Sequence, residues 1–127
     1  MIRRNTFQKK LVMDVAIKLC HPTADEVYAC IFSKYPTVSR ATVYRNLNLL
    51  VAEGMLSKVE MPDGADCFDK TLLKHYHMRC RVCGRVEDAE LPYQSALLEK
   101  LGNTHGFFVE EHDILLKGVC RVCAKLQ

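Results

Sequence analysis

Two C-x-x-C pairs constrain this chain more than any other feature of its sequence. Cys80 and Cys83 form the first pair, and Cys120 and Cys123 form the second. Four thiolates complete the tetrahedral shell of a structural zinc ion, and a closed shell leaves no position for a substrate. The spacing therefore predicts one structural Zn²⁺ per chain. Four buried or redox-active cysteines are the alternative.

Length and composition predict a folded protein that is not secreted. The chain has 127 residues, of which 49% are hydrophobic and 26% charged, so one domain or two very small ones are expected. It contains no apolar run long enough for a membrane span and no secretion signal. We therefore expect a cytoplasmic protein, in which its seven cysteines favour metal binding over disulfides.

The first half predicts three helices followed by a hairpin. Helical spacing and capping signals indicate helices at 7–19, from 23 to about 35, and at 40–53, with a T-x-x-E capping box opening the second and Ser39 capping the third. Strands are expected at 55–61 and 66–70 around a turn at 62–65. The apolar stripe of the first helix comprises Phe7, Leu11, Val12, Val15, Ala16 and Leu19. This order of elements is that of a winged helix-turn-helix.

The second half is a small α/β unit. Strands are expected at 75–80 and 85–91, a helix at 92–104, and a partly alternating segment at 107–120. About fifty residues bury too little surface to be secure alone, so a zinc ion and an oligomeric partner are both expected. The predicted fold is α+β, with domains at 1–70 and 75–127.

Histidines and aspartates suggest a second metal. His75 and His77 lie on the same face of the predicted strand, because side chains alternate along a strand. Asp88 lies on the neighbouring strand, Asp69 ends the hairpin and His21 lies between the first two helices. Nitrogen and oxygen ligands suit iron(II), manganese(II) or zinc. Ordinary surface or core histidines are the alternative for this pair.

The third predicted helix has a polar outward face that could read DNA. Its candidate contact residues are Ser39, Arg40, Thr42, Tyr44, Arg45 and Asn48. Arginine can bind guanine edges or phosphates, and aromatic or methyl groups can contact thymine. The first sixty residues carry nine Lys and Arg against five Asp and Glu, a balance compatible with nucleic acid. A merely solvated helix face is the alternative.

Taken together, these motifs resemble the Fur family of metal-responsive bacterial repressors. The resemblance covers HPTADEVY (21–28), TVYRNL (42–47), Phe68-Asp69, HYHMRCRVCG (75–84) and the Cys120–Cys123 pair. It implies a homodimeric repressor, not an enzyme, that binds A·T-rich inverted repeats when one regulatory divalent metal is bound per chain. The implied regulatory ligands are His21, Asp69, His75, His77 and Asp88.

The resemblance leaves the branch of the family open. Asp69 resembles the peroxide-sensing PerR branch, in which bound iron(II) and peroxide would oxidise His21 or His75, whereas Arg45 resembles the iron-sensing branch. Cys67 is a departure that points towards a zinc-sensing, Zur-like repressor. A third metal site, found in some members, would need ligands at Lys74, Tyr76 and Ser95 besides His112, and we expect it to be absent.

Two interpretations from other classes compete with a repressor. A metal-dependent hydrolase would use the His and Asp ligands with a metal-bound water, but no general acid or base is apparent beyond them. A zinc-ribbon module that binds protein is the other, since a fold does not determine its function. The repressor interpretation expects a palindromic DNA operator as partner, with no membrane and no small-molecule substrate.

Overall fold

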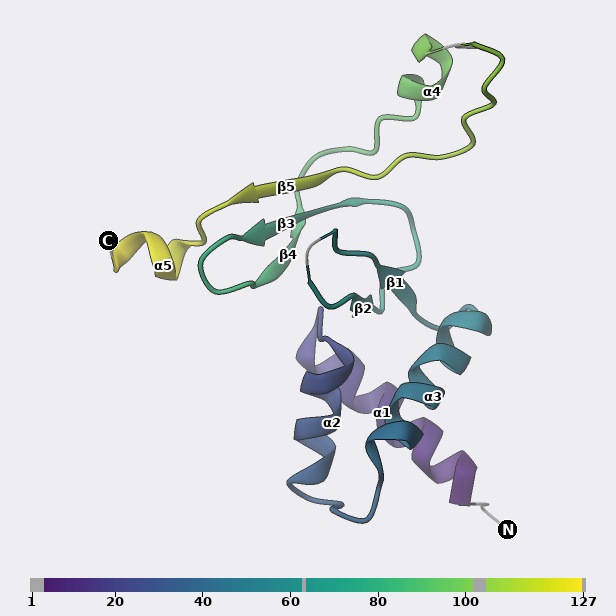
Figure 1. The fold of residues 1–127 in the computed structure, drawn as a ribbon, viewed down its shortest axis with the longest axis vertical. Coiled ribbons are helices and arrows are strands. Elements are labelled where there is room, and N and C mark those ends of the chain that lie inside the picture. Colours follow the sequence, from purple (N-terminus) through teal and green to yellow (C-terminus); the bar gives the residue numbers. More distant parts are fainter. Residues whose placement is uncertain (1–3, 63, 102–104, 127) are drawn as a thin grey trace. The chain divides into compact units, whose positions relative to one another are not determined.

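Figure 1 shows the protein, a computed structural model that describes residues 4–62, 64–101 and 105–126. The chain divides into two compact units between Leu72 and Leu73. The first contains three helices and a two-stranded hairpin, and the second contains a three-stranded sheet and two short helices. The predicted α+β class is therefore confirmed.

The first unit begins with two helices whose ends follow from local sequence. Helix α1 spans Arg4–Leu19 and stops before Cys20, whose φ of 64° is left-handed. Helix α2 spans Ala24–Phe32, and both hydrogen bonds of the predicted capping box are present: the Glu26 N–H donates to Thr23 Oγ1, and the Thr23 N–H donates to Glu26 Oε1.

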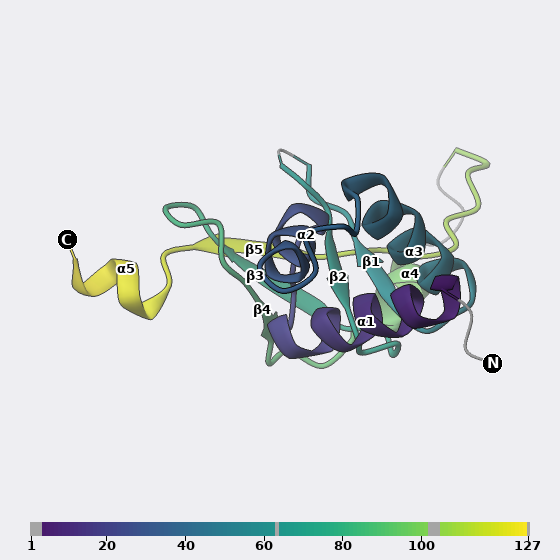
Figure 2. The same cartoon turned by 90° about the horizontal axis from the view of Figure 1, so that it is seen from below.

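Helix α3 spans Arg40–Ala52 and is also capped as predicted. The Thr42 N–H donates to Ser39 Oγ at 3.1 Å. Beyond the helix, Gly54 adopts a φ of 75°, a conformation that glycine reaches without a Cβ clash. Helix α1 contacts both α2 and α3 (Figure 2). The core between them consists of Val12, Ala16, Val27, Ile31, Val38, Val43, Leu47, Leu50, Leu56 and Phe68.

A short hairpin completes the first unit. Strand β1 (Ser57–Val59) pairs antiparallel with β2 (Cys67–Asp69), with Lys58 opposite Phe68. The Phe68 N–H donates to the Pro22 carbonyl oxygen at 2.8 Å, which ties β2 to the connection between α1 and α2. Both strands are shorter than predicted. Asp63, in the predicted turn, lies outside the described residues.

The second unit is built on a mixed sheet of order β4-β3-β5. The central strand β3 (Tyr76–Cys80) pairs antiparallel with β4 (Val86–Ala89) and parallel with β5 (Leu115–Gly118). The β3–β4 connection carries the first cysteine pair. Strand β5 leads into α5 (Arg121–Lys125), which carries the end of the second pair (Figure 1).

One helix prediction is wrong, and one helix was not predicted. The helix expected from Pro92 to Thr104 begins only at Ala96, as α4 (Ala96–Leu101), and just before it the Gln94 N–H donates to the Tyr76 hydroxyl at 2.8 Å. Residues 102–104 lie outside the described residues. Helix α5 was not expected, since five residues are too few to show a helical period.

Some apolar positions are also placed differently from the prediction. Two residues of the predicted apolar stripe of α1, Phe7 and Leu19, are 45% and 37% exposed. Phe7 instead packs edge-on against Tyr35, with ring centroids 5.8 Å apart. Across residues 4–62, 64–101 and 105–126, no helix combines the length and apolarity needed to cross a membrane.

Candidate functional site

The four paired cysteines converge in the second unit. One sulfur from each of Cys80, Cys83, Cys120 and Cys123 lies within 4.8 Å of the other three, and Cys83 Sγ lies 3.8 Å from Cys120 Sγ. Tetrahedral zinc with Zn–S bonds of about 2.3 Å places its sulfurs about 3.8 Å apart. The donor set and its spacing therefore fit a structural zinc ion.

Backbone groups prepare this cluster for a cation. The Cys120 N–H donates to Cys80 Sγ at 3.3 Å, and this bond is the largest cause that lowers the pKa of Cys80 to about 6. Hydrogen bonding with Cys120 raises the pKa of Cys123 to about 12. Without a cation the cluster therefore retains a proton at Cys123, which a bound dication would displace.

The remaining cysteines take no part in such a group. Within the part of the chain that the structure describes, no metal-ligating cluster includes Cys20, Cys30 or Cys67. Cys67 is buried in β2, whereas Cys20 is exposed and Cys30 is partly buried.

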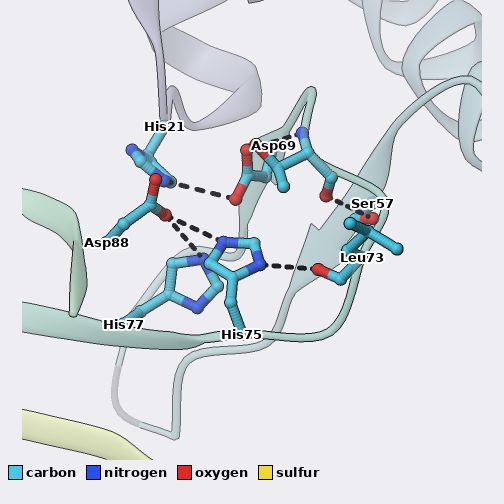
Figure 3. A network of polar contacts seen from close by, with 8 residues as sticks. His21, Ser57, Asp69, Leu73, His75, His77 and Asp88 are labelled. Carbon is cyan, nitrogen blue, oxygen red and sulfur yellow. Dashed lines mark hydrogen bonds and ion pairs between the residues drawn. The ribbon is translucent and has the colours of Figure 1, made fainter. Parts of the chain in front are cut away.

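A second set of ligands gathers on β3 and β4. His77 lies directly opposite Asp88 in the antiparallel register, and His75 precedes the strand on the same face. Asp88 Oδ1 lies 2.8 Å from His75 Nε2 and 3.6 Å from His77 Nε2 (Figure 3). The two imidazole centroids are 4.4 Å apart. The predicted same-face arrangement of the histidines is therefore present.

The orientation of His75 fits a metal ligand. Its Nδ1 lies 2.7 Å from the Leu73 carbonyl oxygen, which can only accept, so Nδ1 carries a proton. In a neutral ring Nε2 then presents a lone pair towards the Asp88 carboxylate, which also presents lone pairs. Two acceptors at this distance need a shared proton or a cation between them. A backbone partner on the far nitrogen is also typical of ligating histidines.

The first unit brings together the two other predicted ligands. His21 Nε2 lies 3.3 Å from Asp69 Oδ2, and Asp69 Oδ1 accepts from the Thr71 N–H at 2.9 Å. Figure 3 shows the His21 ring directed at the Asp69 carboxylate. The bond between Phe68 and Pro22 holds the two segments together. Two side chains alone would leave most positions of a transition metal open.

The outward face of α3 is divided into paired and free side chains. Ser39 Oγ donates to Thr42 Oγ1 at 2.9 Å while capping the helix. Arg40 Nη1 and the Tyr44 hydroxyl both donate to Asp25 Oδ1. Hydrogen bonding to this carboxylate raises the pKa of Tyr44 above its ordinary value. Among the described residues, Arg45 and Asn48 make no side-chain hydrogen bond or ion pair, and both are exposed.

Asp25 is a residue that the sequence analysis did not select. It lies in the first turn of α2, where an acidic residue is already explained by the helix dipole. Its contacts reach 15 and 19 residues along the chain, and no local pattern indicates them. The sequence offered one signal for Asp25, namely its place in the HPTADEVY motif close to the predicted DNA-reading helix.

His112 also has partners that the sequence did not indicate. Its Nε2 lies 2.5 Å from the Tyr76 hydroxyl, and its ring stacks on Tyr93 with centroids 4.7 Å apart. The Tyr76 hydroxyl in turn accepts from the Gln94 N–H. These contacts join β3 to the segments that precede α4 and β5.

Known proteins resemble this chain over most of its length. The sequence model of the ferric uptake regulator family matches residues 3–117. The peroxide operon regulator of Bacillus subtilis is 32% identical over 123 residues, which are 96% of this chain and 85% of that protein. The solved peroxide stress regulator of Campylobacter jejuni is 31% identical, covers 94% of this chain and 91% of its own, and has a TM-score of 0.68.

The fold is shared more widely than the sequence. A structure of the ferric uptake regulator from Francisella tularensis with iron has a TM-score of 0.77 at 18% identity, covering 98% of this chain and 94% of its own. The family match spans nearly the whole chain and includes the first cysteine pair and every predicted regulatory ligand. The chain therefore belongs to the ferric uptake regulator family and is a transcription regulator, not an enzyme.

Proposed function

We propose that this chain is a homodimeric, metal-dependent repressor of the peroxide-responsive branch, which binds A·T-rich inverted repeats. Relatives at 32% identity are named peroxide operon regulator and peroxide-responsive repressor, from Bacillus subtilis and Staphylococcus epidermidis. Asp69, whose side chain faces His21, supports the same branch. Arg45 on α3 argues against this assignment, because an arginine at this position is typical of the iron-sensing branch.

The two units would divide the work. The first, corresponding to the predicted domain 1–70, would be a winged helix-turn-helix in which α2 and α3 form the motif and the β1–β2 hairpin forms the wing. The second, corresponding to 75–127, would be the dimerisation domain with its structural zinc. Its exposed apolar side chains, which include Leu116 at 43% and Phe107 at 71% exposure, support a second copy of the chain as its partner.

The regulatory ion would be held by His21, Asp69, His75, His77 and Asp88. The observation that carries this proposal is the 2.8 Å distance between His75 Nε2 and Asp88 Oδ1 while His75 Nδ1 lies against the Leu73 carbonyl oxygen, because a neutral imidazole in this orientation needs a cation between the two groups. Imidazole and carboxylate ligands without thiolate suit Fe²⁺, Mn²⁺ or Zn²⁺. Neither unit alone contains all five proposed ligands. A metal ion bound by both units would therefore restrict how the two units can be arranged.

Such ligation would make the metal a switch. A ligand shifts a conformational equilibrium only by its different affinity for the two states. An ion that needs ligands from both units favours the arrangement in which they meet. In a dimer, that arrangement sets the spacing between two α3 helices, and half-site spacing on a palindrome is a geometric requirement.

The test is the metal dependence of DNA binding in a His77→Ala variant. With the duplex that the manganese-loaded wild-type protein enriches from a random library, added manganese should tighten wild-type binding. Added manganese should not tighten DNA binding by the variant, because the variant lacks the imidazole ligand that lies opposite Asp88. His105→Ala, which removes an exposed histidine outside the ligand set, is the matched control. Undiminished metal dependence in His77→Ala would overturn the proposed site.

The peroxide response has its own test. Bound iron(II) would supply the redox chemistry, in which one oxygen atom of hydrogen peroxide would be added to the imidazole of His21 or His75 and the other would leave as water. We expect mass spectrometry of iron-loaded protein after peroxide treatment to find one added oxygen on the peptide with His21 or that with His75. Manganese-loaded protein, treated identically, should show none. Absence of the added oxygen from both peptides of the iron-loaded protein would indicate a plain metal sensor.

A further inference from the structure

One carboxylate controls the start of α3. Asp25 Oδ1 accepts from Arg40 Nη1 and from the Tyr44 hydroxyl. The two donors are four residues apart and so lie on the same side of the helix. The Arg40 guanidinium also lies over the Tyr28 ring, 4.6 Å from its centroid. Two side chains of α2 thus determine where two side chains of α3 can point.

Stability is a poor explanation for this arrangement. The side chains of Arg40 and Asp25 are 58% and 63% exposed, and ion pairs this exposed contribute little to folding. Tyr44 is 38% exposed and lies outside the core cluster. The contacts do, however, restrict rotamers that would otherwise be free. Their main consequence is therefore the orientation of exposed groups.

The charge of Asp25 has a second consequence. A guanidinium paired with a carboxylate is a weaker anchor for phosphate than a free one, because its charge is already neutralised. The carboxylate itself also repels the DNA backbone. Non-specific DNA binding depends almost entirely on phosphate neutralisation, whereas specific binding also depends on correctly placed base contacts. An acid at this position therefore affects the two kinds of binding differently.

We propose that Asp25 is a specificity-determining positioning residue, which orients Arg40 and Tyr44 for base contacts and weakens binding to non-operator DNA. The inference rests on the proposed function, namely that α3 reads DNA. It assigns Asp25 no contact with the operator. Its effect is transmitted through two donors whose geometry it fixes.

The test compares Asp25→Asn with Asp14→Asn in the full manganese-loaded chain. Asn keeps the size of the side chain and removes its charge. Asp14 forms an exposed ion pair with Lys10 within α1, so its substitution makes the same change in net charge away from α3. Each protein selects duplexes from a random library. Its affinity is then measured for the wild-type-enriched duplex and for a scrambled duplex, over a range of salt concentrations.

For Asp25→Asn we expect the ratio of operator to scrambled affinity to fall roughly five- to tenfold, within the effect of losing one base contact. Affinity for the scrambled duplex should rise, with its logarithmic salt dependence steeper by about one, as for one more phosphate neutralised. Asp14→Asn should leave the ratio and the selected sequence unchanged. A Tyr44→Phe substitution should have a smaller effect on the ratio in the Asp25→Asn background than in the wild type, because both changes act on the same hydrogen bond, which the loss of the Asp25 charge already weakens.

The outcomes separate this inference from the function on which it rests. If the wild-type protein enriches no sequence, the proposed function fails and the role of Asp25 fails with it. If it enriches a sequence and Asp25→Asn preserves both the sequence and the affinity ratio, only the role of Asp25 is overturned. Thermal unfolding of each variant confirms that a changed ratio belongs to folded protein.

Discussion

Two aspartates each contact a pair of side chains, and the chemistry of these partners distinguishes the roles of the two carboxylates. Asp25 accepts from arginine and tyrosine, which hold their protons near neutral pH and cannot ligate a metal in that form. Asp88 lies between two imidazoles, and each imidazole can present a nitrogen lone pair to a metal ion. The first carboxylate therefore suits a permanent ion pair. The second suits an exchangeable cation.

A single hydroxyl gives a prediction at the same scale. Thr23→Ala removes the side-chain acceptor of the α2 capping box and should lower the free energy of unfolding by about 1 kcal/mol. Thr37→Ala makes the same chemical change at an exposed position that has no side-chain hydrogen bond within the described residues. Urea denaturation compares the two. Equal midpoints would show that the cap contributes nothing to stability.

Helix α3 packs one face against the core of the first unit and leaves the opposite face exposed for the proposed DNA contacts. Val43, Leu47 and Leu50 are buried in the core of the first unit, while Arg45 and Asn48 are exposed. Leu49 departs from this division, because it is apolar and 43% exposed. Among the described residues of the first unit, Leu49 belongs neither to the core cluster nor to the side chains packed against it.

Leu47 and Leu49 permit a matched comparison on one helix. Leu47 is 1% exposed, and its truncation to alanine should cost about 2–5 kcal/mol through lost burial and a residual cavity. Leu49→Ala should change stability by less than about 0.5 kcal/mol, as for other surface substitutions. Thermal or urea unfolding provides the measurement. A large loss for Leu49→Ala would mean that the residue is buried by something beyond the first unit, such as a partner.

How well each element could be predicted follows from the range of the interactions that define it. The start of α2 and both ends of α3 depend on Thr23, Ser39 and Gly54, which act within one turn of the helix, so sequence alone located them. The end of α2 at Phe32 comes before the predicted end near Tyr35. The segment before α4 is instead held by a hydrogen bond between Gln94 and Tyr76, 18 residues apart. Pairing between distant segments leaves no periodic signal, and the same is true of the Asp25 contacts.

The candidate metal ligands show the same distinction. The cysteine pairs and His75-x-His77 were recognisable because their spacing is short and chemically unusual. Their mutual distances still required the β3–β4 register, which brings His77 opposite Asp88. The backbone donor to Cys80 and the Leu73 carbonyl that orients His75 could not be predicted, because backbone groups carry no sequence signature.

At the scale of the whole molecule, the two units differ in how they are stabilised. The core cluster of buried apolar residues lies entirely in the first unit. In the second, the buried residues are few, and two of them, Cys80 and Cys123, are proposed zinc ligands. A unit of this size that buries so little depends on cross-links or partners. Its stability is therefore expected to be coupled to zinc.

Cys83→Ser tests that coupling. It replaces one thiolate of a four-sulfur shell, so the zinc content should fall from about one ion per chain to well below it, since metal affinity and folding are linked in such sites. The second unit should then unfold at lower urea concentration, in a transition separate from that of the first unit, whose core contains no zinc ligand. Cys30→Ser, outside the sulfur cluster, should retain zinc and a wild-type unfolding curve. If Cys83→Ser lost its zinc but unfolded like the wild type, the β3–β4–β5 sheet would be stable without the ion, and the zinc would not be structural.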